Sequence, residues 1–183
     1  MTEDSYDAVV VGVGGVGSAA CAHLAARGVD VLGIERFDVP HAMGSSHGST
    51  RIIRKAYYEH PDYVPLLERA YELWRNLDAD ARSQLLHLTG SVVAGPDESG
   101  KVGDAREACR QHGLEYELLS GAELADRYPG YGLPDDYRAL YQPDGGFLDV
   151  EQSVIAHVRA AYAGGAEIHA RERVLDWEPR ESG

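Results

Sequence analysis

The sequence has 183 residues and a formal net charge of −13, from 17 basic and 30 acidic side chains. An acidic chain is repelled by nucleic acids and anionic membranes, so we expect neither as a partner. No stretch approaches the roughly 18 apolar residues of a membrane span, and the first residues are acidic and polar, unlike a secretory signal. Two cysteines are too few for a disulfide scaffold. These features predict a cytoplasmic protein of one domain or two small ones.

The chain begins with the pattern of a dinucleotide-binding turn. Residues 6–11 are a short β-branched run, typical of a buried parallel strand, and lead directly into Gly12-Val13-Gly14-Gly15-Val16-Gly17. In such a motif Gly12 permits the tight turn, Gly14 lets the backbone approach a pyrophosphate, and Gly17 lets the next helix pack closely. The motif therefore predicts a strand, a glycine turn and a helix.

A second strand and an acid complete this pattern. The helix is expected to bury a stripe formed by Val16, Ala20 and Leu24 and to end at Gly28. Residues 29–34 predict a strand, closed by Glu35, which lies 18 residues after Gly17. A carboxylate at this distance suits a hydrogen bond from a ribose hydroxyl. A glycine turn that binds nothing is the less favoured alternative.

After Glu35 we expect a loop that carries binding groups, two helices, and then the crossing into another domain. Residues 36–50 form a polar loop, and loops at strand ends hold ligands in such folds. For residues 51–58 we predict a short helix with Arg51 and Arg54 on one face. A longer helix follows from residue 61, and a strand at 86–95 marks the crossing into another domain.

The rest of the chain predicts an α+β insertion and a return to the first sheet. Ser120 and Glu123 have the spacing of a capping box and start a helix that runs to about residue 128. A helix from Asp149 ends at Gly164-Gly165. The other expected elements are a helix at 104–112 and strands at 116–119, 137–142, 166–169 and 173–177. We accordingly predict a nucleotide-binding domain made of residues 1–85 and 149–183, with residues 86–148 belonging to a substrate domain.

The loop from Gly44 to Arg54, with the sequence GSSHGSTRIIR, resembles the monomeric sarcosine oxidase and N-methyltryptophan oxidase family of flavoenzymes. The similarity continues through residues 60–66, 70–74 and 141–148. It implies an α/β fold with a Rossmann-like FAD-binding domain, whose sheet is doubly wound and mostly parallel, and an inserted α+β substrate-domain portion. It also implies an FAD-dependent amine oxidase that converts a secondary amino acid, N-methyl or cyclic, such as sarcosine, to an imine and reduces oxygen to hydrogen peroxide.

The resemblance also implies roles for individual residues. His47 and Arg51 lie near the flavin ring in the family, where positive charge stabilises the anionic reduced flavin, and they are the catalytic candidates. Arg54 matches the arginine that binds the substrate carboxylate, a role suited to its planar fork of donors. Tyr57 matches a family tyrosine to which we assign no chemical step. The expected cofactor contacts are Gly12, Gly14, Gly17, Glu35, Arg36, Ser45, His47, Arg51 and Val174.

Several of these assignments have alternatives. Arg36 could be a solvated surface arginine, and Arg51 could pair structurally with Asp38 or Glu59. The remaining histidines have no ligand spacing, so no metal is assigned. The glycine fingerprint alone would also fit an NAD-dependent dehydrogenase or a truncated, non-catalytic nucleotide-binding module.

The resemblance implies that part of the oxidase lies beyond this sequence. Members of the family are longer, and the additional part supplies the cysteine that attaches the flavin covalently and the lysine linked to oxygen activation. Cys21, Cys109, Lys55 and Lys101 do not match these positions. We therefore expect the amino-terminal half of an oxidase or a natural short form. Its partners would be the amino-acid substrate, oxygen and the missing carboxyl-terminal half, and the isolated chain is predicted to be inactive.

Overall fold

A computed structural model describes residues 5–81, 84–96 and 100–179. The chain forms two compact units. Unit 1 contains the described residues up to Thr50 and from Asp149 onward, and unit 2 contains those from Arg51 to Leu148.

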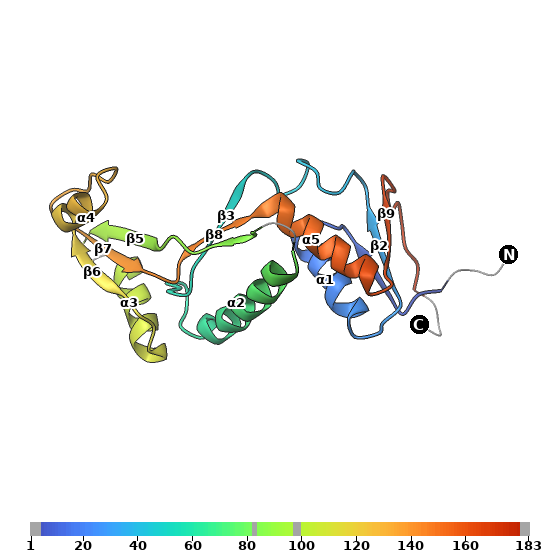
Figure 1. The fold of residues 1–183 in the computed structure, drawn as a ribbon, viewed down its shortest axis with the longest axis horizontal. Coiled ribbons are helices and arrows are strands. Elements are labelled where there is room, and N and C mark those ends of the chain that lie inside the picture. Colours follow the sequence, from blue (N-terminus) through green and yellow to red (C-terminus); the bar gives the residue numbers. More distant parts are fainter. Residues whose placement is uncertain (1–4, 82–83, 97–99, 180–183) are drawn as a thin grey trace. The chain divides into compact units, whose positions relative to one another are not determined.

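Unit 1 is a parallel sheet covered by two helices (Figure 1). The strands β1 (Ala8–Val11), β2 (Val31–Glu35) and β9 (Glu167–Ala170) are hydrogen-bonded in the order β1-β2-β9, and both pairs are parallel. The helices α1 (Gly15–Ala25) and α5 (Val150–Ala163) lie side by side. Residues 166–169 thus return to the first sheet, as predicted, and the mixed α/β fold class is confirmed.

The apolar stripe predicted for α1 is right at Leu24, which is partly buried against the core cluster, but wrong at Val16. Val16 is 86 % exposed, and the residues that α1 buries are instead Ser18, Cys21, Ala22 and Ala25. The reason is that α1 packs against two neighbours, the sheet and α5, so small side chains are needed between the helices. The approach is so close that a Cβ added to Gly164, just after α5, would lie 2.9 Å from the Cβ of Ala25.

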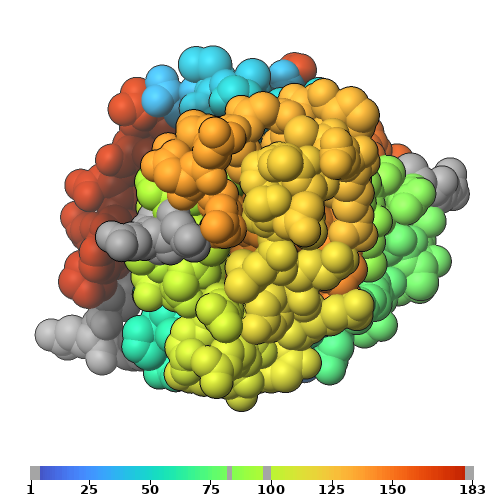
Figure 2. Space-filling view, turned by 90° about the vertical axis from the view of Figure 1, so that its left-hand side faces the viewer, coloured from blue at the N-terminus to red at the C-terminus, as the bar shows by residue number. Residues whose placement is uncertain are grey.

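In its described residues, unit 2 contains two three-stranded sheets and three helices. One sheet has the order β3 (Thr50–Ile53), β8 (Gly146–Asp149), β4 (Leu86–His87). The other is antiparallel and has the order β5 (Ser91–Pro96), β7 (Tyr137–Gln142), β6 (Glu117–Ser120). The helices are α2 (Tyr63–Asp80), α3 (Gly100–His112) and α4 (Gly121–Arg127). Figure 2 shows the face of this unit on which α3 and α4 are exposed.

The local sequence signals of unit 2 are mostly confirmed. The Ser120 hydroxyl accepts a hydrogen bond from the Glu123 backbone N–H at 3.2 Å, and the Glu123 carboxylate accepts one from the Ser120 N–H at 2.8 Å. These reciprocal bonds are the predicted capping box at the start of α4. The predicted strand at 86–95 is divided into β4 and β5, with Gly90 between them at a φ of 81°.

Two other predictions of secondary structure are wrong. Residues 51–58 are not a helix, because the chain is a strand up to Ile53 and irregular after it. Ile52 and Ile53 are β-branched and suit a strand, and β3 gains a partner in β8, almost a hundred residues later in the chain. Residues 173–177 are irregular as well, although the described chain continues past them.

The compact units also differ in extent from the predicted segments. Residues 51–85 lie in unit 2 because Ile53 and Tyr71 share a core cluster with Leu86 and Leu148. The Tyr71 hydroxyl also donates a hydrogen bond to the carbonyl of Asp144 at 2.7 Å. The other change between the two units falls between Leu148 and Asp149. Which unit serves which function stays a prediction. No described helix is both long enough and apolar enough to cross a membrane.

The packing of α1 against α5 leads to a prediction on acid stability. His157 is buried on α5, with Nδ1 3.0 Å from the carbonyl oxygen of Ser153 and its ring 6.2 Å from that of His23. Burial lowers the pKa of His157, the Ser153 contact opposes this, and His23 lowers it further. Below pH 6.5, the ordinary value, the unfolded chain therefore binds a proton that the folded chain resists, and stability falls.

We expect urea unfolding at about pH 7.5 and about pH 5 to show a smaller loss of stability for His157→Gln than for the wild type. His60→Gln, which changes an exposed histidine, should lose as much as the wild type. If all three proteins lost the same stability on acidification, His157 would not contribute to the loss.

Candidate functional site

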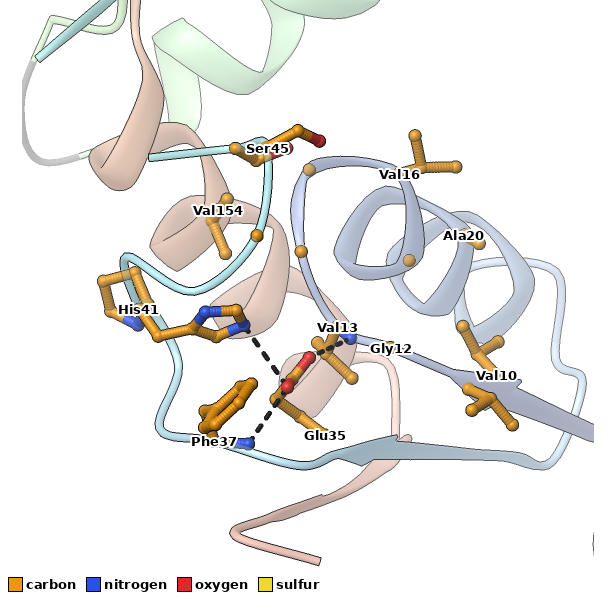
Figure 3. A pocket seen from close by; sticks show the side chains of 17 residues that line it. Val10, Gly12, Val13, Val16, Ala20, Glu35, Phe37, His41, Ser45 and Val154 are labelled. Carbon is orange, nitrogen blue, oxygen red and sulfur yellow. Dashed lines mark hydrogen bonds and ion pairs between the residues drawn. The ribbon is translucent and has the colours of Figure 1, made fainter. Parts of the chain in front are cut away.

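A cavity of about 430 Å³ lies in unit 1, where β1 passes through the glycine turn into α1 (Figure 3). Its size is in the range of small-molecule sites, and its position, at the carboxyl ends of parallel strands, is where α/β sheets bind ligands. The walls are the turn, the start of α1, the end of β2, the loop after β2 and one residue of α5. The lining residues are Val10–Gly17, Ala20, Glu35, Phe37, Pro40, His41, Gly44, Ser45, Ser46 and Val154.

The glycines of the turn differ in what surrounds them. A Cβ on Gly17 would lie 1.7 Å from the carbonyl oxygen of Gly12, so only glycine lets α1 pack here. Gly12 itself has a φ of +93°, which favours glycine. Gly14 faces open space, with no atom within 4 Å of an added Cβ. A Cβ on Gly12 would also meet no atom within 4 Å, so the backbone is open to a ligand at both Gly12 and Gly14, and only Gly14, with a φ of −83°, would accept a side chain without strain.

The start of α1 supplies the electrostatics for an anion. The first N–H groups of a helix have no intrahelical acceptor and carry the positive end of the helix dipole. Gly15 and Gly17 line the cavity, so these N–H groups lie at its edge. The first turn of α1 contains no acidic side chain. This end of the cavity is thus suited to a phosphate or pyrophosphate.

Glu35 supplies a buried carboxylate on the other side of the cavity. It is 5 % exposed and accepts hydrogen bonds from the backbone N–H groups of Val13 at 2.9 Å and Phe37 at 3.0 Å. Nε2 of His41 lies 3.3 Å from Oε1 (Figure 3). Burial works to raise the pKa of Glu35, but the hydrogen bonds from Phe37, Val13 and His41 outweigh it and leave the pKa below its usual value. Glu35 is therefore anionic near neutral pH.

A second cluster, in unit 2, surrounds the guanidinium of Arg54. This group lies 4.7 Å from the ring centres of both Tyr57 and Tyr58, and it pairs with Glu59 at 3.2 Å. Its Nε is buried without a hydrogen-bond partner in the described part of the chain. The next two backbone N–H groups are held by Gln142, whose side-chain oxygen accepts both, at 3.0 and 2.9 Å. The cluster thus holds the Arg54 guanidinium between two tyrosine rings and the Glu59 carboxylate.

The predicted site residues are distributed over both units. The cavity brings together Gly12, Gly14, Gly17, Glu35 and Ser45. Arg36, His47 and Val174 also belong to unit 1 but do not line the cavity, and each is exposed. The predicted residues in unit 2 are Arg51, which is exposed, Arg54 and Tyr57.

The structure shows the surroundings of Arg36 and of the two acids considered as partners of Arg51. The Arg36 guanidinium lies 5.0 Å from the ring centre of Phe37, a lining residue. Asp38, considered as a partner of Arg51, pairs with Arg171 at 2.6 Å. Glu59, the other candidate, pairs with Arg54. Both acids thus have a cation other than Arg51 beside them.

Sequence reasoning missed several residues that line the cavity. Phe37, Pro40, His41, Gly44 and Ser46 come from the loop that follows Glu35. The available signal was their place in a polar loop directly after a strand-end acid. Val154 was expected only as part of the apolar face of α5.

Cysteine and metal chemistry find no support in the part of the chain that the structure describes. No group of three His, Cys, Asp or Glu side chains there could hold a metal ion. Cys21 and Cys109 are both buried and free. Burial raises the pKa of the Cys109 thiol to about 11, and it raises that of Cys21, partly offset by a backbone hydrogen bond. Both thiols are therefore protonated at neutral pH and poor nucleophiles.

Comparison with known proteins agrees with this geometry. Residues 7–183 match the family described as FAD dependent oxidoreductase. The chain belongs to this family. The match covers both units, so the FAD dependent oxidoreductase family accounts for the parallel sheet of unit 1 together with the α+β unit that interrupts it, and the resemblance stated from the sequence is confirmed.

Several of the proteins that this chain resembles are named as oxidases. The chain is 41 % identical over 179 residues to the monomeric sarcosine oxidase of Streptomyces avermitilis, covering 98 % of this chain and 47 % of that protein. It is 37 % identical over 163 residues to the N-methyl-L-tryptophan oxidase of Yersinia pestis, covering 89 % and 44 %. The structure of NikD, described as an unusual amino acid oxidase essential for nikkomycin biosynthesis, matches with a TM-score of 0.86 and 33 % identity over 98 % of this chain and 47 % of NikD. The chain thus spans about half the length of these relatives.

The glycine turn gives a prediction for this member of the family. Gly17→Ala should lower the free energy of unfolding by about 1 to 3 kcal/mol, because its Cβ would collide with the backbone of Gly12. Gly14→Ala is the matched control, since its Cβ meets no atom within 4 Å, and it should change stability by less than about 0.5 kcal/mol. Denaturant unfolding of the two variants would check this. A well-folded Gly17→Ala protein would show that the turn is packed differently.

Proposed function

We propose that this chain is the amino-terminal half of an FAD-dependent oxidase that converts a secondary amino acid, N-methyl or cyclic, such as sarcosine, to an imine and passes the electrons to oxygen, giving hydrogen peroxide. The observation that carries the proposal is the cavity of unit 1, in which a glycine turn, a helix start and a buried acid lie together. The family and the 41 % identity to a sarcosine oxidase support the amine substrate.

The residues of the cavity fit the adenosine diphosphate part of FAD. The N–H groups at the start of α1 would bind the pyrophosphate, and the open space at Gly14 would let it approach the backbone. The Glu35 carboxylate would accept a hydrogen bond from the adenine ribose. Ser45 lines the cavity, while Arg36, His47 and Val174 stay proposed contacts. When bound, FAD supplies the two-electron acceptor for amine oxidation.

The amino-acid substrate would be bound by Arg54. Its guanidinium already holds one carboxylate, that of Glu59, and the two tyrosine rings fix its plane. A substrate carboxylate would compete with Glu59 for the same fork of N–H donors. His47 and Arg51 would provide positive charge near the flavin ring. No side chain in this chain needs to serve as a base.

Turnover would require more polypeptide than this chain contains. The chain covers 47 % of the Streptomyces enzyme, so about half of that relative is not matched by this chain. We infer that the isolated chain does not turn over and that it works with such a half, with the amino acid and oxygen as its small-molecule partners. The cytoplasm is the proposed compartment.

Titration with FAD tests the proposed function. We expect the protein to bind FAD, measured by quenching of flavin fluorescence, and Gly14→Ala to weaken binding at least about tenfold because its methyl group would occupy the space of the pyrophosphate. Unfolding measurements on Gly14→Ala separate this loss from misfolding. Binding of NADH without binding of FAD would overturn the proposal in favour of a nicotinamide enzyme.

The role of Arg54 is testable in the full-length protein. Arg54→Lys should raise KM for sarcosine about 10- to 100-fold, with a smaller change in kcat, because a charge-assisted bidentate contact of about 1.5 to 3 kcal/mol is lost. Arg127→Lys is a matched control, since Arg127 also lies over two tyrosine rings, those of Tyr128 and Tyr141, and pairs with Glu117 at 2.8 Å. An unchanged KM for Arg54→Lys would exclude this carboxylate site.

A further inference from the structure

We propose that His41 is a positioning residue of the ribose site, which acts as a neutral imidazole that donates from Nε2 to the Glu35 carboxylate. The inference rests on the proposed function, because it concerns how the cavity binds the adenosine part of a dinucleotide. His41 lies in the loop after β2, and both it and Glu35 line the cavity (Figure 3). The contacts of the two ring nitrogens indicate which of them carries the proton.

The backbone of Met43 determines where the proton of His41 lies. The Met43 N–H donates to Nδ1 of His41 at 3.0 Å, so Nδ1 carries a lone pair and no proton. The proton of the neutral ring is then on Nε2, which is 3.3 Å from Oε1 of Glu35. A cationic ring would place two N–H groups against each other at Nδ1. The structure therefore favours one neutral tautomer, with a donor directed at Glu35.

A neutral donor suits a carboxylate that must also bind a ligand. The ring shares Oε1 with the Phe37 N–H, and Oε2 accepts from the Val13 N–H. Because a carboxylate has about four acceptor positions, Oε2 keeps capacity for one ribose hydroxyl. A cation at the position of His41 would compensate the charge of Glu35, whereas a neutral ring orients the carboxylate and leaves it a strong acceptor.

The contact also ties the loop wall of the cavity to β2. The side chain of His41 is 15 % exposed, and its ring packs against that of Phe37 with a centroid distance of 5.0 Å. Pro40, Gly44 and Ser45 form the same wall. Loss of the Nε2 contact would therefore weaken nucleotide binding through Glu35 and the loop, with no direct contact between His41 and the ligand required.

Two substitutions separate the two nitrogens of the ring. In His41→Asn the amide oxygen can take the place of Nδ1 and keep the Met43 bond, but nothing reaches Glu35. In His41→Gln the amide nitrogen can take the place of Nε2 and keep the Glu35 bond. ADP is the probe, because it carries the ribose and pyrophosphate without the flavin, and its Kd is measured by titration calorimetry. His60→Asn is the control, since Nδ1 of His60 accepts the Asp62 N–H at 3.2 Å, just as Nδ1 of His41 accepts the N–H two residues on.

We expect His41→Asn to raise the Kd for ADP about 5- to 10-fold, as for the loss of one hydrogen bond to a charged group. His41→Gln and His60→Asn should stay within about twofold of the wild type. Equal affinity of His41→Asn and the wild type, or equal weakening by Asn and Gln, would overturn the positioning role. A wild-type protein that binds no ADP would instead overturn the proposed function.

Nitrogen NMR of the wild-type imidazole gives a test that does not depend on the folding of a variant. Long-range ¹H–¹⁵N correlation at neutral pH should show His41 protonated on Nε2 and unprotonated on Nδ1. The opposite tautomer, or a ring protonated on both nitrogens, would contradict the assignment.

Discussion

The hydrogen bonds to Glu35 are the interactions on which the cavity depends. They join three segments at one carboxylate: the glycine turn through Val13, the end of β2 through Phe37, and the following loop through His41. A buried anion without donors would cost several kcal/mol, so the turn, strand and loop must keep this arrangement for the fold to hold. Two of the donors are backbone groups and do not rely on a ligand. The orientation of the carboxylate proposed to bind ribose is thus set by the chain itself.

The part of the fold that the sequence predicts well is the part governed by short-range geometry. Gly12 needs a positive φ and Gly17 cannot carry a Cβ, so the turn restricts its residues directly. The length of α1 fixes the distance to Glu35, and the capping box of Ser120 and Glu123 closes within four residues. In each case the constraint lies within one strand, turn or helix and is therefore visible in the sequence.

Two of the failures have a common cause in partners that are distant along the chain. The exposed side of α1 was misassigned because α5, which begins at Val150, covers the small residues around Ala22 and leaves Val16 free. Residues 51–53 became a strand because β8 pairs with them. His41 was missed for a different reason: Glu35 is close to it along the chain, but the contact depends on how an irregular loop turns back to place Nε2 at that carboxylate. No local periodicity encodes such contacts.

The comparison of Arg54 with Arg127 shows why a side-chain constellation needs its surroundings before it is read as a site. Both guanidinium groups lie over two tyrosine rings and pair with a glutamate, so the arrangement alone is a general way to pack an arginine. They differ in burial, because the Arg54 side chain is 20 % exposed and that of Arg127 is 41 % exposed. The Arg54 segment is also fixed by the buried amide of Gln142. A cation held in this way loses little freedom when it binds a carboxylate, and this preorganisation, more than the stacked rings, is the argument for the proposal that Arg54 binds the substrate.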